Sequence, residues 1–166
     1  MFEKKSSYRP NVGIVIINSQ GKLMWCRRRN HDGWQFPQGG IDKNETSLDA
    51  VLRETEEEVG LTKNDFDIEW ESKGWFYYKV PEERRKRYFV GKNDFIGQKQ
   101  KWYVAKLKEG KEKNIDLSKN IPIEFDHYIW VNYWYPLNEV VHFKKEVYRS
   151  LLIELLPKYI NLTKQD

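Results

Sequence analysis

The sequence predicts an α/β protein in which two or three helices pack on a mixed β-sheet. Two short, largely apolar runs, 12–17 and 23–28, have the pattern of strands joined by a turn. A longer run at 96–107 alternates between polar and apolar residues over most of its length, as a half-buried strand does. Apolar residues recur at helical spacing over 46–59 and 144–159, which indicates amphipathic helices. Further elements are expected over 68–80 (a strand or a bent pair), 125–133 (a strand) and 135–141 (a short helix).

The helix over 46–59 has a predicted start, a buried side and an end. Thr46 and Ser47 are candidates for the N-cap, and Gly60 is placed to end the helix in the left-handed conformation. The residues expected to face the core form one stripe: Leu48, Val51, Leu52, Thr55 and Val59.

The other side of this helix carries three glutamates at i, i+3 and i+4 spacing, Glu54, Glu57 and Glu58. Side chains at this spacing emerge on one face, where like charges repel one another. Oxygen ligands of this kind suit Mg²⁺ or Mn²⁺, and Arg53 can offset part of the charge. A run of glutamates is more often a solvated acidic face. The paired glycines before the helix and the glycine after it favour the metal site.

From Gly39 to Leu61 the chain resembles the Nudix box of nucleoside-diphosphate-linked hydrolases. The matching positions are Gly39, then Glu45 after five residues, and after seven more Arg53-Glu54-x-x-Glu57-Glu58-x-Gly60-Leu61. The one departure is Thr55, where the family usually carries an aliphatic residue, and it concerns packing rather than metal ligands. The resemblance implies the Nudix fold, an α/β/α sandwich around a mixed β-sheet.

Outside the box the chain resembles the bacterial RNA pyrophosphohydrolases, a branch that also contains the dinucleoside polyphosphate hydrolases. The stretches that carry this resemblance include Tyr8-Arg9-Pro10-Asn11-Val12-Gly13, 34–40, 96–102, Glu124-Phe125-Asp126, 133–136 and Val147-Tyr148-Arg149. It implies an enzyme that hydrolyses the phosphoanhydride at the 5′ end of di- or triphosphorylated RNA, leaves a 5′-monophosphate and promotes mRNA decay. Hydrolysis of dinucleoside polyphosphates such as diadenosine tetraphosphate is the alternative. A catalytically silent RNA- or nucleotide-binding module is a third hypothesis, but it would have no need for the clustered glutamates.

The resemblance also implies residues for metal binding and catalysis. More than one Mg²⁺ or Mn²⁺ ion is expected, with ligands from the Gly39 carbonyl, Glu54, Glu57, Glu58 and Glu124. Glu54 is the expected general base, Glu124 competes for that role, and Glu57 belongs to the same catalytic cluster. Arg53 is expected to orient the carboxylates, and Glu45 to support the loop or an outer metal shell.

Six residues match substrate-binding positions of the family: Arg9, Arg28, Tyr78, Val141, Phe143 and Lys144. Arg9 and Lys144 would contact phosphate groups, whereas Arg28 and Phe143 would sandwich a base in a pocket that Val141 lines. Core packing is a nearly equal alternative for Phe143, and Tyr78 is the weaker phosphate candidate because a tyrosine usually packs.

Length and composition bound the remaining expectations. The 166 residues suffice for a single domain, 1–166 with a core of residues 8–160, and one cysteine, Cys26, excludes an internal disulfide. The net charge of +4 favours anionic partners but does not separate RNA from nucleotides. The basic run at 84–87 is expected to be an exposed connection, although an RNA strand could use it. With no visible signal peptide or membrane-spanning stretch, we expect a cytoplasmic monomer with no membrane partner.

Overall fold

The structure is a computed structural model that describes residues 7–91 and 94–164. The strands in this part of the chain are β1 (Ser7–Ile17), β2 (Leu23–Arg28), β3 (Trp34–Gln35), β4 (Gln38–Gly40), β5 (Phe66–Glu71), β6 (Phe76–Lys79), β7 (Phe95–Leu107) and β8 (Phe125–Val131). Its helices are α1 (Ser47–Val59), α2 (Glu82–Tyr88), α3 (Tyr135–Glu139) and α4 (Lys145–Thr163), with 3₁₀ turns η1 (Glu112–Asn114) and η2 (His142–Lys144). These described strands form one mixed sheet in the order β3-β2-β1-β7-β5, and β4, β6 and β8 pair with β1, β7 and β2. β1 and β7 run parallel, while the other pairs are antiparallel.

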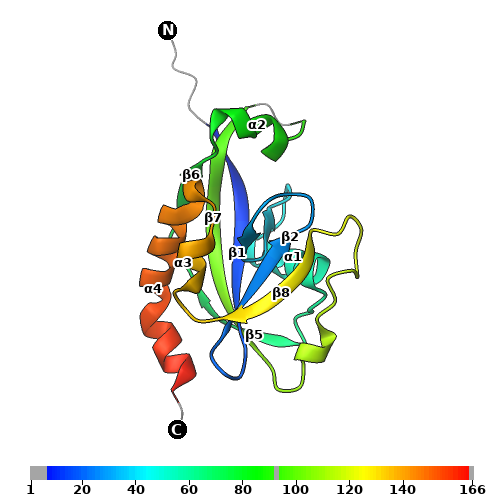
Figure 1. Ribbon diagram of the computed structural model, residues 1–166, viewed down its shortest axis with the longest axis vertical. Coiled ribbons are helices and arrows are strands. Elements are labelled where there is room, and N and C mark those ends of the chain that lie inside the picture. Colours follow the sequence, from blue (N-terminus) through cyan, green and yellow to red (C-terminus); the bar gives the residue numbers. More distant parts are fainter. Residues whose placement is uncertain (1–6, 92–93, 165–166) are drawn as a thin grey trace.

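The sheet is covered on both faces, as β1 illustrates. Ile14 and Ile16 belong to the core cluster that contains the buried side of α1. Val15 and Ile17 belong to the cluster that contains the buried side of α4. Successive residues of a strand point to opposite faces, so one apolar run serves both cores. Figure 1 shows α1 on one side of the sheet and α3 and α4 on the other, which confirms the α/β/α sandwich.

The predicted start and end of α1 are confirmed. Thr46 Oγ1 accepts a hydrogen bond from the Asp49 N–H at 3.1 Å, and Gly60 has φ 78° in the left-handed region. The predicted apolar stripe is wrong at one position, because Leu48 is 44% exposed. Thr55 is fully buried, and its hydroxyl donates to the Val51 carbonyl at 2.6 Å, so the one departure from the box is accommodated inside the helix.

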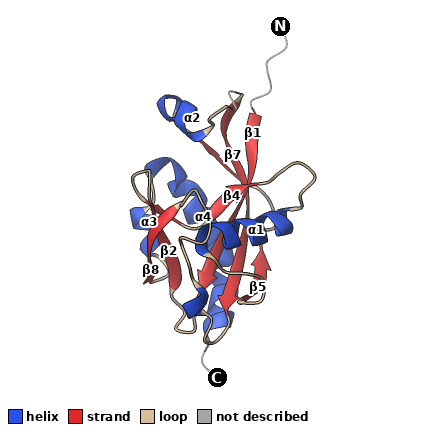
Figure 2. Cartoon of the chain, turned by 90° about the vertical axis from the view of Figure 1, so that its right-hand side faces the viewer, coloured by secondary structure: helices blue, strands red, loops and turns tan. Residues whose placement is uncertain are grey.

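The run 68–80, predicted to be a strand or a bent pair, contains two strands, β5 and β6, that both pair with β7. Two other segments differ from the sequence prediction. The helix α4 continues past residue 159 to Thr163. The basic run expected to be an exposed connection lies in α2, which has acidic residues in its first turn and basic residues in its last, as the helix dipole favours. Both views place α2 at one end of the sheet, beside β1 and β7 (Figures 1 and 2). Across the described ranges, no helix combines the length and the apolar character needed to cross a membrane.

Candidate active site

Two glycines of β4 bring its backbone against functional side chains. A Cβ atom added at Gly39 would lie 1.9 Å from Glu54 Cδ, and one added at Gly40 would lie 2.3 Å from Arg9 Nη2. These distances are far below van der Waals contact, so any larger residue would displace Glu54 or Arg9. Gly39 is paired with Val12 of β1, which holds this backbone in place. The Gly39 peptide therefore lies directly beside the Glu54 carboxylate.

Arg53 connects the acids of α1 to this glycine strand. Its guanidinium donates to the two carboxylate oxygens of Glu45 at 2.8 and 3.0 Å and to the Gly40 carbonyl at 2.9 Å. It also donates to Glu54 Oε1 at 2.8 Å and to Glu57 Oε2 at 3.2 Å. Charge-assisted bonds of this forked kind fix orientation as well as adding energy. The hydrogen bond from Arg53 is the main reason why the pKa of Glu45 is below its usual value.

The three glutamates of α1 have different surroundings. Burial is the main cause that raises the pKa of Glu54 to about 7, although Arg53 acts in the opposite direction. Glu58 is buried, and this burial, together with the charges of Glu54 and Glu124, raises its pKa well above the usual range. The side chain of Glu57 is 48% exposed. A cation close to crowded carboxylates of this kind offsets the repulsion between their negative charges.

One cavity of about 290 Å³ brings most of the predicted site residues together. Its lining includes Arg9, Arg28, Gly39, Glu54, Glu58, Glu124 and Lys144. Glu57 lies outside this lining, although it belongs to the same box. Carboxylates and cations from five separate parts of the chain thus face one space, an arrangement that suits a polyanion together with a divalent cation.

Lys144, which is buried, and Arg28, which is partly buried, supply positive charge to this catalytic cavity. Lys144 is 1% exposed, and its Nζ donates to Gln35 Oε1 at 3.0 Å. Burial is the main cause that lowers the pKa of Lys144 to about 7, and the charge of Arg28 acts in the same direction. Arg28 Nε lies 3.5 Å from Glu124 Oε1, and Arg28 Nη1 donates to the Tyr88 hydroxyl at 3.4 Å. An ammonium has three donors and a guanidinium five, so a ligand in the cavity can accept further bonds.

The structure places the other three predicted substrate residues beside the catalytic cavity rather than in its lining. Tyr78 is buried, and its hydroxyl donates at 2.6 Å to Gln98 Oε1, which does line the cavity. Phe143 is partly buried, with its ring centre 6.0 Å from that of Tyr78. Val141 lines a second, adjoining cavity that also contains Arg28.

The chemistry of the donor set fits a hard divalent cation. Glu54, Glu58, Glu124 and Gly39 border the same cavity, and oxygen is the ligand atom that Mg²⁺ and Mn²⁺ prefer. Between residues 7 and 91 and between 94 and 164, no three acidic, His or Cys side chains are grouped so as to hold one ion. In this arrangement Arg53 donates to Glu54 and so occupies part of the same carboxylate.

Sequence reasoning missed several polar residues of the cavity. They are Asn11, His31, Gln35, Gln38, Tyr88 and Gln98, whereas Arg87 comes from the basic run 84–87. Beneath the cavity, the predicted strands β1 and β7 are linked by a buried bond in which Gln100 Nε2 donates to Asn11 Oδ1 at 2.8 Å. The alternation of Gln98 and Gln100 along β7 was a usable indication, because amides on one face of a buried strand need polar partners. His31 borders both cavities.

Comparison with known families identifies this constellation. The model of the NUDIX domain matches residues 7–156, which is most of the chain. The chain belongs to the NUDIX family. The resemblance drawn from the box is therefore confirmed, and Nudix hydrolases generally need divalent metal ions.

Curated relatives of this NUDIX chain cover nearly its whole length. An RNA pyrophosphohydrolase of Francisella tularensis subsp. mediasiatica (strain FSC147) is 48% identical over 89% of the chain and 93% of that protein. Another RNA pyrophosphohydrolase, of Psychrobacter sp. (strain PRwf-1), is 49% identical over 89% of the chain and 84% of that protein.

Solved structures share the fold at low sequence identity. The E. coli dihydroneopterin triphosphate pyrophosphohydrolase aligns with a TM-score of 0.67 and 17% identity, covering 90% of this NUDIX chain and 99% of that one. A C. elegans Ap4A hydrolase binary complex aligns with a TM-score of 0.64 and 19% identity, covering 90% and 98%. At this identity the likeness concerns the fold alone.

Proposed function

We propose that the chain is an RNA 5′-pyrophosphohydrolase, which hydrolyses the phosphoanhydride of 5′-di- or triphosphorylated RNA, leaves a 5′-monophosphate and so promotes mRNA decay. The observation that carries this proposal is the catalytic cavity, in which Glu54, Glu58 and Glu124 share one space with Arg9, Arg28 and Lys144. The relatives named RNA pyrophosphohydrolase support the choice of substrate. Because mRNA is the proposed substrate, we propose that the enzyme acts in the cytoplasm. We propose separately that it acts as a monomer.

The metal-ligand set that we propose is the Gly39 carbonyl with Glu54, Glu57, Glu58 and Glu124, holding Mg²⁺ or Mn²⁺ and more than one ion. Bound there, the metal would neutralise phosphate charge and acidify water. Arg53 keeps Glu54 and Glu57 in place through its hydrogen bonds. Glu57 would have to turn from its exposed position to join this set, and Glu45 would anchor Arg53 from the loop.

Glu54 is our preferred general base. It borders the cavity, and the 2.8 Å hydrogen bond that Arg53 donates to its Oε1 fixes the orientation of its carboxylate. In the step, a water oxygen bonds to phosphorus, its proton passes to a Glu54 oxygen, and the anhydride P–O bond breaks with release of phosphate or pyrophosphate. Glu124 is the competing base, since it lines the same cavity.

The remaining residues would hold the substrate. Arg9 and Lys144 line the cavity and would contact phosphate groups, while the guanidinium of Arg28 would stack on a base. Val141 would line the base pocket beside Arg28. Phe143 would close that pocket only after moving from its contact with Tyr78, and Tyr78 would act on phosphate through Gln98.

The deciding experiment compares product release with Mg²⁺ from 5′-triphosphate RNA, 5′-diphosphate RNA and diadenosine tetraphosphate. Faster release from RNA ends supports the proposal, and Glu54→Gln should lose about 10²–10⁴-fold in kcat, the usual contribution of a general base. Glu56→Gln is the matched control, since Glu56 lies on the same helix and pairs with Lys119 at the surface. Near-normal turnover of Glu54→Gln would transfer the base role to Glu124 or Glu57.

Dinucleoside polyphosphate hydrolysis remains the second candidate, because a cavity that takes a polyphosphate and a base can accept both substrates. Preferential cleavage of diadenosine tetraphosphate would establish it. Binding of RNA without turnover, in metal or in chelator, would instead indicate a silent binding module.

A further inference from the structure

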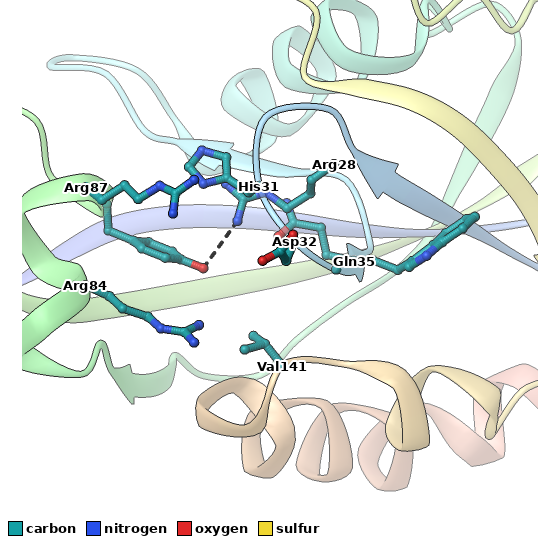
Figure 3. A pocket seen from close by; sticks show the side chains of 10 residues that line it. Arg28, His31, Asp32, Gln35, Arg84, Arg87 and Val141 are labelled. Atoms are coloured by element: carbon teal, nitrogen blue, oxygen red, sulfur yellow. Dashed lines mark hydrogen bonds between the residues drawn. The ribbon is translucent and has the colours of Figure 1, made fainter.

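A second cavity of about 150 Å³ adjoins the catalytic cavity, and it is walled on one side by α2. The two cavities share Arg28, His31, Gln35, Arg87 and Tyr88 in their linings. The second cavity adds Asp32, Gly33, Trp34, Arg84 and Val141. In Figure 3, Arg84 extends from α2 towards Val141, with Arg28 on the far side of the space. A ligand that fills the catalytic cavity can therefore continue into this one without leaving the protein surface.

The basic residues of α2 are not equivalent. Arg84 and Arg87, three positions apart and so on one face of the helix, line the second cavity. Arg85 has a structural role, because its Nε donates to the Val80 carbonyl at 2.9 Å. Lys86 is exposed and outside the lining of both cavities. If the basic side chains of α2 were only solvated, we would not expect two of its guanidinium groups to line a cavity that adjoins the active site.

Positive charge is concentrated where the two cavities meet. His31 borders both, and burial is the main cause that lowers its pKa. The charges of Arg28, Arg87 and Lys144 lower the pKa of His31 further, against the opposing charge of Glu124. Three glutamates, Glu54, Glu58 and Glu124, line the catalytic cavity, where a divalent metal would bind. Among the described residues that line the second cavity, Asp32 is the one acidic residue. The second cavity is thus suited to an anion that brings no metal of its own.

Aromatic rings hold the guanidinium groups in position. Arg84 lies over the Phe143 ring at 5.7 Å, and Arg28 lies over the Tyr88 ring at 5.6 Å. The Tyr88 and Phe143 rings meet edge to face at 5.6 Å, so the two cation–ring pairs are continuous. Arg87 is held from the other side by a 3.2 Å bond to the Asn30 carbonyl. A guanidinium that is already oriented loses less entropy when it binds a phosphate.

We propose that Arg84 and Arg87 bind phosphodiester groups of the single-stranded RNA that leads away from the catalytic cavity. The inference rests on the proposed function and extends it, because it assigns the α2 side of the second cavity to the RNA backbone that follows the base beside Arg28 and Val141. A phosphodiester brings one negative charge and no metal, which matches the cationic lining. A mononucleotide, or a dinucleoside polyphosphate held in the catalytic cavity, lacks this downstream backbone. The second cavity would therefore make the enzyme prefer RNA over short nucleotides.

The test measures binding directly, with a fluorescent, 5′-monophosphorylated RNA of eight nucleotides, and with adenosine 5′-monophosphate as competitor. The variants are Arg84→Gln/Arg87→Gln, which keeps much of each side-chain stem, and Lys86→Gln as the control of equal chemistry on the same helix. Each phosphate contact to a single strand steepens the fall of log K with log[salt] by about 0.7. Relative to 1 M salt, one contact therefore contributes about fivefold in affinity at 0.1 M salt. The double variant should bind the octamer about 25-fold more weakly, with a salt slope shallower by about 1.4.

The competitor and the control decide the interpretation. We expect the loss for adenosine monophosphate to be much smaller than for the octamer, and the loss for Lys86→Gln to be less than twofold. Equal losses for octamer and mononucleotide would overturn the proposal, since the arginines would then act on the catalytic cavity. An equal loss in Lys86→Gln, or no loss in the double variant, would overturn it as well.

The same measurement separates this inference from the proposed function. If the wild-type protein binds the octamer more tightly than the mononucleotide but fails to hydrolyse triphosphorylated RNA, the proposed activity is wrong and the RNA-binding role of Arg84 and Arg87 stands. If it hydrolyses triphosphorylated RNA but binds the octamer and the mononucleotide equally tightly, the RNA-binding role of Arg84 and Arg87 is wrong and the proposed activity stands.

Discussion

Single atoms decide the geometry at the residue scale, and Gly39 is the sharpest case. Gly39→Ala would insert a Cβ atom 1.9 Å from Glu54 Cδ, so the carboxylate must move by an ångström or more. Because displacement of this size in an active site costs about 10²-fold in rate, we expect that loss in kcat with little change in the circular dichroism spectrum. Product release from 5′-triphosphate RNA is the readout.

Gly74→Ala is the matched control for this substitution. Gly74 has open space where its Cβ would lie, with nothing within 4 Å. It should retain wild-type turnover. Normal turnover in Gly39→Ala would mean that Glu54 can shift without penalty, which would argue against Glu54 as the base.

At the scale of elements, the end of α1 depends on Gly60. Its φ of 78° is unfavourable for a side chain, and an added Cβ would lie 2.8 Å from the Asp116 carbonyl oxygen. Gly110 also has a positive φ, 72°, but open space around it. Gly110→Ala should therefore cost about 1–2 kcal/mol from the backbone alone. Gly60→Ala should cost about 1–3 kcal/mol more, from crowding.

Urea unfolding of the two variants checks this difference. Since the last turn of α1 carries Glu57 and Glu58, we also expect Gly60→Ala to lower turnover and Gly110→Ala to leave it unchanged. Equal free energies of unfolding in the two variants would show that the contact with Asp116 relaxes freely.

Elements governed by local rules could be predicted to within a residue or two, whereas those governed by tertiary contacts could not. The cap at Thr46 and the stop at Gly60 fixed α1 from the sequence. Residues 82–88 have no apolar periodicity, so nothing local separated a helix from a loop there. Spacing placed Glu57 and Glu58 on one face, yet Glu58 is buried and Glu57 exposed. That difference depends on where β4 docks, which is a long-range property of the pairing with β1.

The catalytic cavity belongs to the whole molecule, because its lining comes from β1, β2, β3, β4, β7, α1, α2, η2 and the loops before β3 and β8. A family resemblance could assign residues to it, but the amides that join the strands beneath it became visible only in the fold. Such a site buries charge that the unfolded chain leaves in water, and this charge links its chemistry to global stability. Lys144 makes the link measurable, since it is both buried and cationic.

Burial lowers the pKa of Lys144 from its ordinary value near 10.5 to about 7. Between these values the unfolded chain binds more protons than the folded one, so stability rises with pH across this window. Below pH 7 both states are protonated, and the full cost of burying the charge is present. Lys144→Met removes this dependence. The free energy of unfolding of the variant minus that of the wild type should therefore fall by about 2 kcal/mol from pH 7 to pH 9.

Urea unfolding of both proteins in chelator, at several pH values, measures this difference while metal binding is held out of the comparison. Taking the difference also removes the titration of groups that both proteins share. Lys22→Met is the control, because Lys22 is partly exposed and bonds to Asn132 near the sheet end, away from both cavities. The free energy of unfolding of Lys22→Met should change with pH in parallel with that of the wild type. If the free energies of unfolding of Lys144→Met and the wild type instead change with pH in parallel, Lys144 stays protonated in the folded protein. The charges of Glu124 and Glu58, which raise its pKa, would then outweigh its burial.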